Sequence, residues 1–193
     1  MFKSSSIIKT NVAALLVAFS ALSFAGDSYI AASVGFVDAY EKVTADEFGD
    51  AIEPFTVETK LTALNARLGK HYGEYFAAEV RLGVGLGDDV IQIDGVDTIA
   101  NLEIRDMYGI YARAVARIAE RFYPYVLIGY SHANLEGSID QFTAEGDFGG
   151  VSYGIGLDVQ IKRDLSANLE YISYFDSLGL ELSGFSLGLS RAF

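Results

Sequence analysis

Hydrophobic residues recur at every second position along most of the chain after residue 25. In 76–87 apolar side chains alternate with glycine and charge, and in 182–193 they alternate with serine and glycine. Side chains on a β-strand point to opposite faces with a period of two, so each such segment predicts a strand with one apolar face and one small or polar face. The predicted strands are 29–37, 59–69, 76–87, 102–118, 124–133, 151–161, about 168–175, and 182–193.

Two of these strands carry an open question. Residues 112–120 (ARAVARIAE) contain good helix formers, which is the competing interpretation. Arg113 and Arg117 nevertheless keep the period-two register of Gly109 and Tyr111, which favours a strand. The facing of 124–133 is left undecided by its pattern.

The connections between the predicted strands alternate between long and short. The four long ones, 38–58, 88–103, 134–149 and 176–181, hold 18 of the 26 acidic residues, whereas the short ones hold basic residues such as Lys70, Arg121, Lys162 and Arg163. Eight antiparallel strands with short turns at one end and long loops at the other are typical of an outer-membrane β-barrel. We therefore predict an all-β, eight-stranded antiparallel transmembrane barrel with short periplasmic turns and four long acidic outer loops.

The first 25 residues have the layout of a secretory signal peptide. Lys3 and Lys9 precede an apolar run, 12–22, and small residues lead to a predicted cut after Ala25. The alternative is an amino-terminal membrane anchor, but the apolar run is short of the roughly 20 residues that a spanning helix needs. We expect 1–25 to be a signal peptide and 26–193 a single barrel domain, which then carries 12 basic and 26 acidic residues.

A soluble, lipocalin-like barrel would also show alternation, with its apolar face turned inward. The predicted polar face is rich in glycine and serine, interrupted by charges of both signs, which suits the crowded bore of an eight-stranded barrel. Aromatic residues gather at strand ends, as in the girdles of membrane barrels. We expect the bore to contain a paired polar network with a structural role, made by Arg67, Glu79, Arg81, Glu103, Arg105, Arg113, Arg117, Asp158 and Glu170.

Three stretches and the last strand resemble the small OmpA/OmpX-type outer-membrane barrels. The stretches are YGIYAR (108–113), FYPYVLIGY (122–130) and SYGIGLDVQIKRDLSANLEY (152–171), and the chain stops on an aromatic residue. The resemblance implies residence in the cell outer membrane as a monomer, contact with outer-membrane lipid and lipopolysaccharide, and handling by periplasmic chaperones and the barrel-assembly machinery. It also implies an assembly signal in the last strand, formed by Phe185, Leu187, Leu189 and Phe193. Arg191 departs from the family, which usually has an apolar or aromatic residue there.

The sequence offers little catalytic chemistry. Ser131-His132-Ala133-Asn134 loosely resembles the His and Ser of lipid A deacylase barrels, but adjacent strand residues point to opposite faces, so Ser131 and His132 are poorly placed as nucleophile and base. There is no cysteine and no His/Cys metal spacing, and we expect no cofactor, no metal site and no catalytic residues. The acidity of the chain argues against nucleic acid as a partner.

The acidic connections have the oxygen ligands that Ca²⁺ and Mg²⁺ prefer, and divalent cations could bridge them to lipopolysaccharide phosphates. The function expected is therefore a non-catalytic barrel that presents acidic surface loops for envelope integrity, adhesion or surface interaction. The alternatives are a lipid A-modifying barrel enzyme and a small selective channel.

Overall fold

The computed structural model describes residues 27–43, 55–140, 142–177 and 179–193. They form nine strands: β1 (Ser28–Val43), β2 (Phe55–Tyr72), β3 (Phe76–Gly85), β4 (Asp88–Ile93), β5 (Val96–Val115), β6 (Phe122–Ile139), β7 (Phe142–Gln160), β8 (Leu165–Ser177) and β9 (Leu180–Ala192). In the described ranges, no helix is long and apolar enough to cross a membrane. The predicted signal peptide, with its cut after Ala25, lies outside them.

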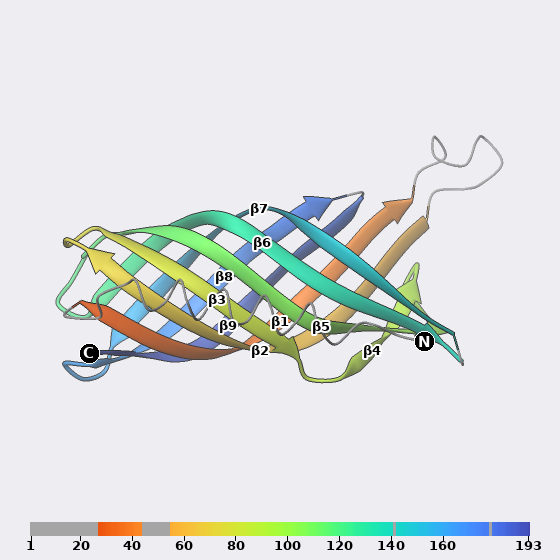
Figure 1. Cartoon of the computed structure of the whole chain (residues 1–193), viewed down its shortest axis with the longest axis horizontal. Coiled ribbons are helices and arrows are strands. Elements are labelled where there is room, and N and C mark those ends of the chain that lie inside the picture. Colours follow the sequence, from red (N-terminus) through yellow and green to blue (C-terminus); the bar gives the residue numbers. More distant parts are fainter. Residues whose placement is uncertain (1–26, 44–54, 141, 178) are drawn as a thin grey trace, which may run out of the picture.

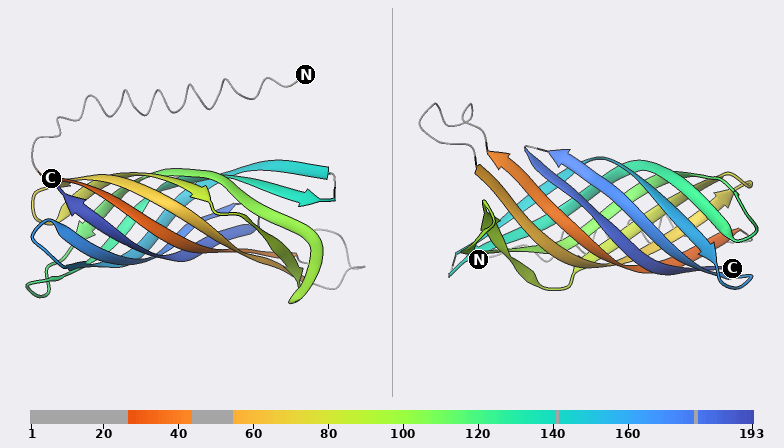
Figure 2. Two further views of the ribbon diagram at one scale, coloured as in Figure 1. Left: turned by 90° about the horizontal axis from the view of Figure 1, so that it is seen from below. Right: turned by 180° about the vertical axis from the view of Figure 1, so that it is seen from behind.

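Eight of the strands close into a ring, which confirms the predicted eight-stranded antiparallel barrel. The ladder runs β1-β9-β8-β7-β6-β5-β3-β2, and β1 pairs with β2 to complete the circle, every pairing being antiparallel. The ninth strand, β4, folds back on β5 and pairs with β2 only at Gln92 and Ile93, so it is an addition to the ring. The strands cross the long axis of the molecule at an angle, as tilted barrel strands do (Figures 1 and 2).

One end of the barrel carries the short turns and the carboxy terminus. The turn between β2 and β3 uses Gly73 at a φ of 76°, a left-handed conformation that glycine adopts without strain. The amide of Phe193 donates to the carbonyl of Ser28 at 2.9 Å, so the chain end is tied to the first strand. We call the opposite end, where the strands run further, the outer end.

Over the part of the ring away from the outer end, the apolar side of the strands faces outward. Phe185, Leu187 and Leu189 on β9 are more than half exposed, whereas Ser186 between them is 4% exposed. On β6, whose facing the sequence left open, Val126, Ile128 and Tyr130 point out; the inward residues are Tyr125 and Leu127. An apolar outer surface of this kind is typical of a barrel wall that is surrounded by lipid.

The long connections are shorter than their sequence suggested, because much of each is strand. Residues 134–149 form the continuation of β6 and β7, which stay paired up to Ile139 and Phe142. Residues 88–101 form β4 and the first part of β5, and β8 and β9 pair as far as Ser177 and Leu180. Many of these residues are charged and exposed to solvent. Their charges interrupt the period-two pattern in the sequence, although the hydrogen-bonded ladder between the strands continues.

Two bulges reverse the facing expected for the residues beyond them. The register of β5 shifts between Ile104 and Asp106, so Ile104, expected on the lipid side, is 1% exposed inside the barrel. The register of β8 shifts between Ser173 and Phe175, and Phe175 likewise lies inside. One extra residue on one strand moves the side chains on the far side of the bulge to the opposite face of the sheet.

Candidate functional site

A layer of charged side chains, contributed by β3 and by other strands of the ring, crosses the bore. Arg81 donates to Glu79 on its own strand and to Glu170 on β8, with Nη2–Oε2 distances of 2.5 and 2.9 Å. Arg113 on β5 bonds Glu79 at 2.5 Å and Asp158 at 2.7 Å, and Arg67 approaches Glu170 at 3.4 Å. These three arginines and three carboxylates balance in charge, as buried ions must if they are not to destabilise the barrel.

Tyrosines enclose this layer. Tyr29 donates to Glu79, and Tyr125 donates to Glu170 at 2.9 Å. The guanidinium carbon of Arg113 lies 3.6 Å from the centre of the Tyr125 ring, and that of Arg81 lies 4.4 Å from the Tyr111 ring. Such contacts between a cation and an aromatic face add to the hydrogen bonds.

Each of these tyrosines covers a glycine directly opposite on the neighbouring strand. The register pairs are Tyr29 with Gly69, Tyr111 with Gly129, and Tyr125 with Gly156. A Cβ added at any of the three glycines would overlap the tyrosine ring. The missing side chains therefore let the rings lie flat on the wall and leave room for the arginines.

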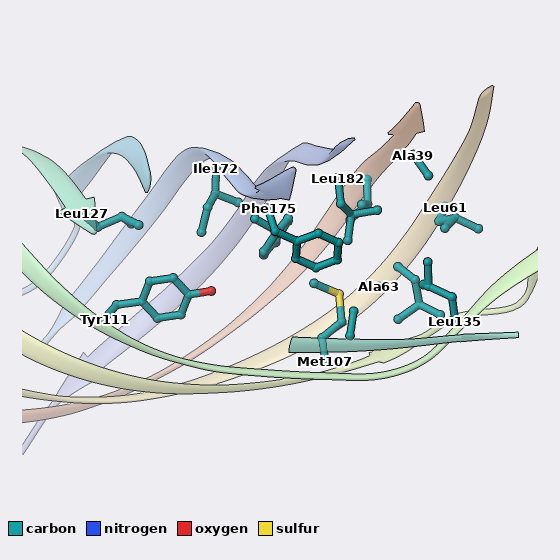
Figure 3. Close-up of a cluster of buried hydrophobic side chains, with 14 of the residues drawn as sticks. Ala39, Leu61, Ala63, Met107, Tyr111, Leu127, Leu135, Ile172, Phe175 and Leu182 are labelled. Atoms are coloured by element: carbon teal, nitrogen blue, oxygen red, sulfur yellow. The ribbon is translucent and has the colours of Figure 1, made fainter. Parts of the chain in front are cut away.

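Nearer the outer end the bore is apolar (Figure 3). Met107, Leu135, Phe175 and Leu182 converge there with other buried side chains, and Phe148 stacks on Phe175 with ring centres 6.5 Å apart. A cavity of about 20 Å³ lies between this cluster and the charged layer, lined by Arg81, Met107 and Tyr111 among others. That is room for about one water molecule. The bore is thus filled at two levels, one ionic and one apolar.

The structure places six of the nine residues expected in the bore inside it: Arg67, Glu79, Arg81, Arg113, Asp158 and Glu170. It places the other three elsewhere. Glu103 lies before the β5 bulge and Arg105 is its extra residue; both face outward, and the Arg105 side chain is 48% exposed. Arg117 follows the end of β5, is exposed, and lies 5.9 Å from the ring of Tyr123. The sequence pattern did not single out the tyrosines, which only cross-strand register reveals.

Beyond the ring, the outer parts of β5, β6 and β7 continue as a sheet, and β4 pairs with β5 at its other edge. We call the sheet of 96–104 with 134–139 and 142–149 the outer sheet; its β6–β7 hairpin stands clear of the β8–β9 end in Figures 1 and 2. Its outward face carries a row of carboxylates, because Glu103 is register partner of Glu136, and Glu136 of Glu145. Arg105 bonds Glu136 at 2.7 Å and Glu145 at 2.8 Å, which offsets the repulsion within the row.

Ser131 and His132 point to opposite sides of β6, as the alternation predicted. Ser131 is buried and hydrogen-bonded to Tyr111 and, at 2.6 Å, to Ser152. His132 faces outward, packs against the Tyr108 ring with ring centres 4.8 Å apart, and lies 3.3 Å from Asp147. These two side chains do not form a nucleophile–base pair. In the described part of the chain, no group of three or more His, Asp or Glu side chains is arranged to hold a metal ion.

Comparison with known proteins agrees with this architecture. Residues 12–193 match the outer membrane protein β-barrel domain family. No curated protein sequence matches the chain.

Three solved barrels are similar in structure. The attachment invasion locus protein Ail of Yersinia pestis, crystallised with the heparin analogue sucrose octasulfate, has a TM-score of 0.56 at 14% identity, over 86% of this chain and 99% of Ail. Neisserial surface protein A has a TM-score of 0.60 at 12% identity (86% and 97% covered), and the amino-terminal barrel of Pseudomonas aeruginosa OprF has 0.56 at 11% (87% and 98% covered). At these identities the likeness shows the fold.

Proposed function

The chain belongs to the outer membrane protein β-barrel domain family, and from this premise we propose that it is a non-catalytic barrel of the outer membrane that works through its outer sheet. The observation that carries the proposal is the β6–β7 hairpin, which extends past the outer end of β8 and β9 (Figure 2). A rigid wall that holds up an exposed segment is a common way to position an interaction surface.

The filled bore supports the same proposal. A solute entering from either end meets the paired ions around Arg81 or the apolar cluster around Phe175. Among the described residues the interior is therefore packed at both levels, which argues against a water-filled path and against a pocket for a ligand of ordinary size. What remains for contact with the surroundings is the outer rim.

The negative charge of the outer rim limits the class of partner that it can bind. Ail has been crystallised with a sulfated sugar, which is a polyanion. The outer sheet here displays Glu103, Glu136, Glu145 and Asp147 against Arg105, so it would repel a polyanion and favour a basic partner. Anionic lipopolysaccharide beside the rim would need divalent cations to bridge its phosphates to the rim carboxylates. We propose that these bridges form without a defined metal site.

Shortening the hairpin tests the proposal. Removing 136–145 and joining Leu135 to Gly146 by Asn-Gly leaves a register pair closed by a two-residue turn, with the barrel untouched. Cells bearing the full chain should attach to surfaces coated with basic proteins, and cells bearing the shortened chain should lose that attachment. A mobility shift on unboiled gels verifies that both barrels fold. Equal attachment by the two would refute the proposal.

A further inference from the structure

An open groove lies on the outward side of the barrel wall, across β2, β3, β5 and β6. Its volume is about 530 Å³. Ala78 and Ala112, outward-facing register partners on β3 and β5, are small and form its floor. The larger side chains of Leu68, Val80 and Ile110 stand beside them. The volume falls within the roughly 300–1,000 Å³ that is usual for ligand sites. The two alanines therefore leave a depression large enough for an apolar ligand.

The groove runs obliquely from the end with the short turns toward the middle of the wall. Tyr72, the last residue of β2, lies at one end of it, whereas Ile128 and Tyr130 lie well along β6, which begins at Phe122. The short turns of an outer-membrane barrel face the periplasm. The end of the groove at Tyr72 therefore lies in the periplasmic leaflet, which consists of phospholipids. An acyl chain whose headgroup is at Tyr72 would follow the groove into the membrane.

The same end of the groove carries a positive charge. Lys70 lines the groove on the outward side of β2, and it is the register partner of Ala78 on the floor. A lysine near a membrane interface extends its ammonium group to the level of the headgroups, where tyrosine is also favourable. Lys70 and Tyr72 thus bring an ammonium group and a phenol, both hydrogen-bond donors, to the place where a lipid phosphate lies.

The charge distinguishes this groove from the rest of the wall. Glu79 also borders the groove, but its side chain points into the bore and pairs there with Arg81 and Arg113. A second groove of about 660 Å³ lies further round the wall beside Val126 and Tyr171, and none of the described residues that line it is charged. Both grooves suit an acyl chain, and the one at Lys70 suits an anionic headgroup as well.

We propose that the groove at Lys70 binds one phospholipid of the periplasmic leaflet that carries a net negative charge, such as phosphatidylglycerol. Lys70 and Tyr72 donate to its phosphate, and one acyl chain lies over Ala78 and Ala112. Burial of the chain retains the lipid, and the ammonium group selects the headgroup, because basic side chains near a membrane surface attract anionic lipid. The site lies at the end of the barrel opposite the outer sheet, so it is independent of the proposed function.

Native mass spectrometry of the full chain tests the headgroup. The protein is released from mixed micelles with equal amounts of phosphatidylglycerol and phosphatidylethanolamine that have identical acyl chains. The adduct with one phosphatidylglycerol should exceed that with one phosphatidylethanolamine about fivefold, the effect expected of one basic side chain at an anionic surface. Lys70→Gln should bring the ratio close to unity. Lys162→Gln, the same change at an exposed position after β7, should leave it unchanged.

Filling the groove tests the acyl-chain contact. Ala112→Leu places a larger side chain on the floor and should lower the retention of both phospholipids. Ala167→Leu is the control, at a position of β8 outside the groove, and should retain both as the unaltered chain does. A mobility shift on unboiled gels verifies that each variant folds.

Three results would overturn the inference. The first is a ratio near unity for the unaltered chain, or one that Lys70→Gln leaves unchanged, which would show an adventitious lipid only. The second is equal retention by Ala112→Leu and Ala167→Leu, which would place the acyl chain elsewhere on the wall. The third is preferential retention of lipid A when it is added to the micelles, because the occupant would then come from the outer leaflet.

Discussion

Arg81 and Glu170 are joined by two parallel hydrogen bonds across the full width of the bore. Arg81 Nη1 lies 2.5 Å from Glu170 Oε1, and Nη2 lies 2.9 Å from Oε2. Their strands, β3 and β8, are opposite each other in the ring of eight. A bidentate pair of this kind fixes both charges in direction as well as distance, and here it braces two walls that share no ladder.

Removal of Glu170 should destabilise the barrel strongly. Glu170→Ala leaves Arg81 with Glu79 alone and removes the carboxylate that Arg67 contacts at 3.4 Å, in a buried site. Breaking a buried pair in this way costs about 3–5 kcal/mol. Urea unfolding of the barrel in liposomes would measure it. The control is Asp164→Asn, which breaks an exposed pair with Arg191 and should cost less than about 1 kcal/mol; equal losses would contradict the expectation.

Gly156→Ala should also destabilise, through steric overlap. The new methyl group would occupy the position of the Tyr125 ring and push it off Arg113. Overpacking of a filled interior costs about 1–3 kcal/mol. Gly137→Ala on β6 is the matched control, since its Cβ would meet nothing closer than 4.0 Å. Thermal unfolding of both variants in detergent should show a lower Tm for Gly156→Ala alone, and an unchanged Tm would show that the ring has room to move.

Because the bore is filled both at the charged layer and at the apolar cluster, we expect the barrel to conduct no measurable current in planar lipid bilayers. Arg81→Ala opens the charged layer, but the apolar cluster around Met107 and Phe175 still blocks the path, so conductance should stay at background. Combining it with Phe175→Ala removes side chains from both barriers and should give measurable current. Current from Arg81→Ala by itself would show that the apolar cluster is no barrier and would favour the selective-channel alternative.

Arg105 should stabilise the outer sheet and contribute little to the stability of the barrel. Arg105→Glu adds a carboxylate beside Glu103, Glu136 and Glu145 and removes the cation that bridges Glu136 and Glu145. We expect faster amide hydrogen exchange in 134–149, with the free energy of unfolding of the barrel lowered by less than about 1 kcal/mol. Lys60→Glu, the same charge reversal at an exposed position of β2, is the control and should leave exchange in 134–149 unchanged.

His132→Ala should leave the lipid A profile of overexpressing cells unchanged. Its neighbour Ser131 is buried on the other face of β6, so the pair lacks the reach that acyl transfer requires. Mass spectrometry of extracted lipid A would show this. Loss of a deacylated species in the variant would revive the enzyme alternative.

The sequence by itself determined the barrel and most of its facing. Period-two alternation is a local consequence of having lipid on one side of a strand and a crowded bore on the other, so it can be recognised one segment at a time. Residues such as Glu79, Arg81 and Arg113 fell on the inward face because their strands run without interruption there. The closing strand, with Phe185 and Leu187 outward, was equally clear.

Tertiary structure decided what local pattern cannot express. Which carboxylate meets which arginine across the bore depends on ring closure, and the seating of Tyr125 on Gly156 depends on register between strands. The bulge at Arg105 adds a residue to β5 and moved Glu103 and Arg105 to the outside. The outer sheet was hidden for a related reason: above the membrane no lipid requires one face of a strand to be apolar throughout, so hydrogen bonding between strands continues where the hydrophobic pattern stops.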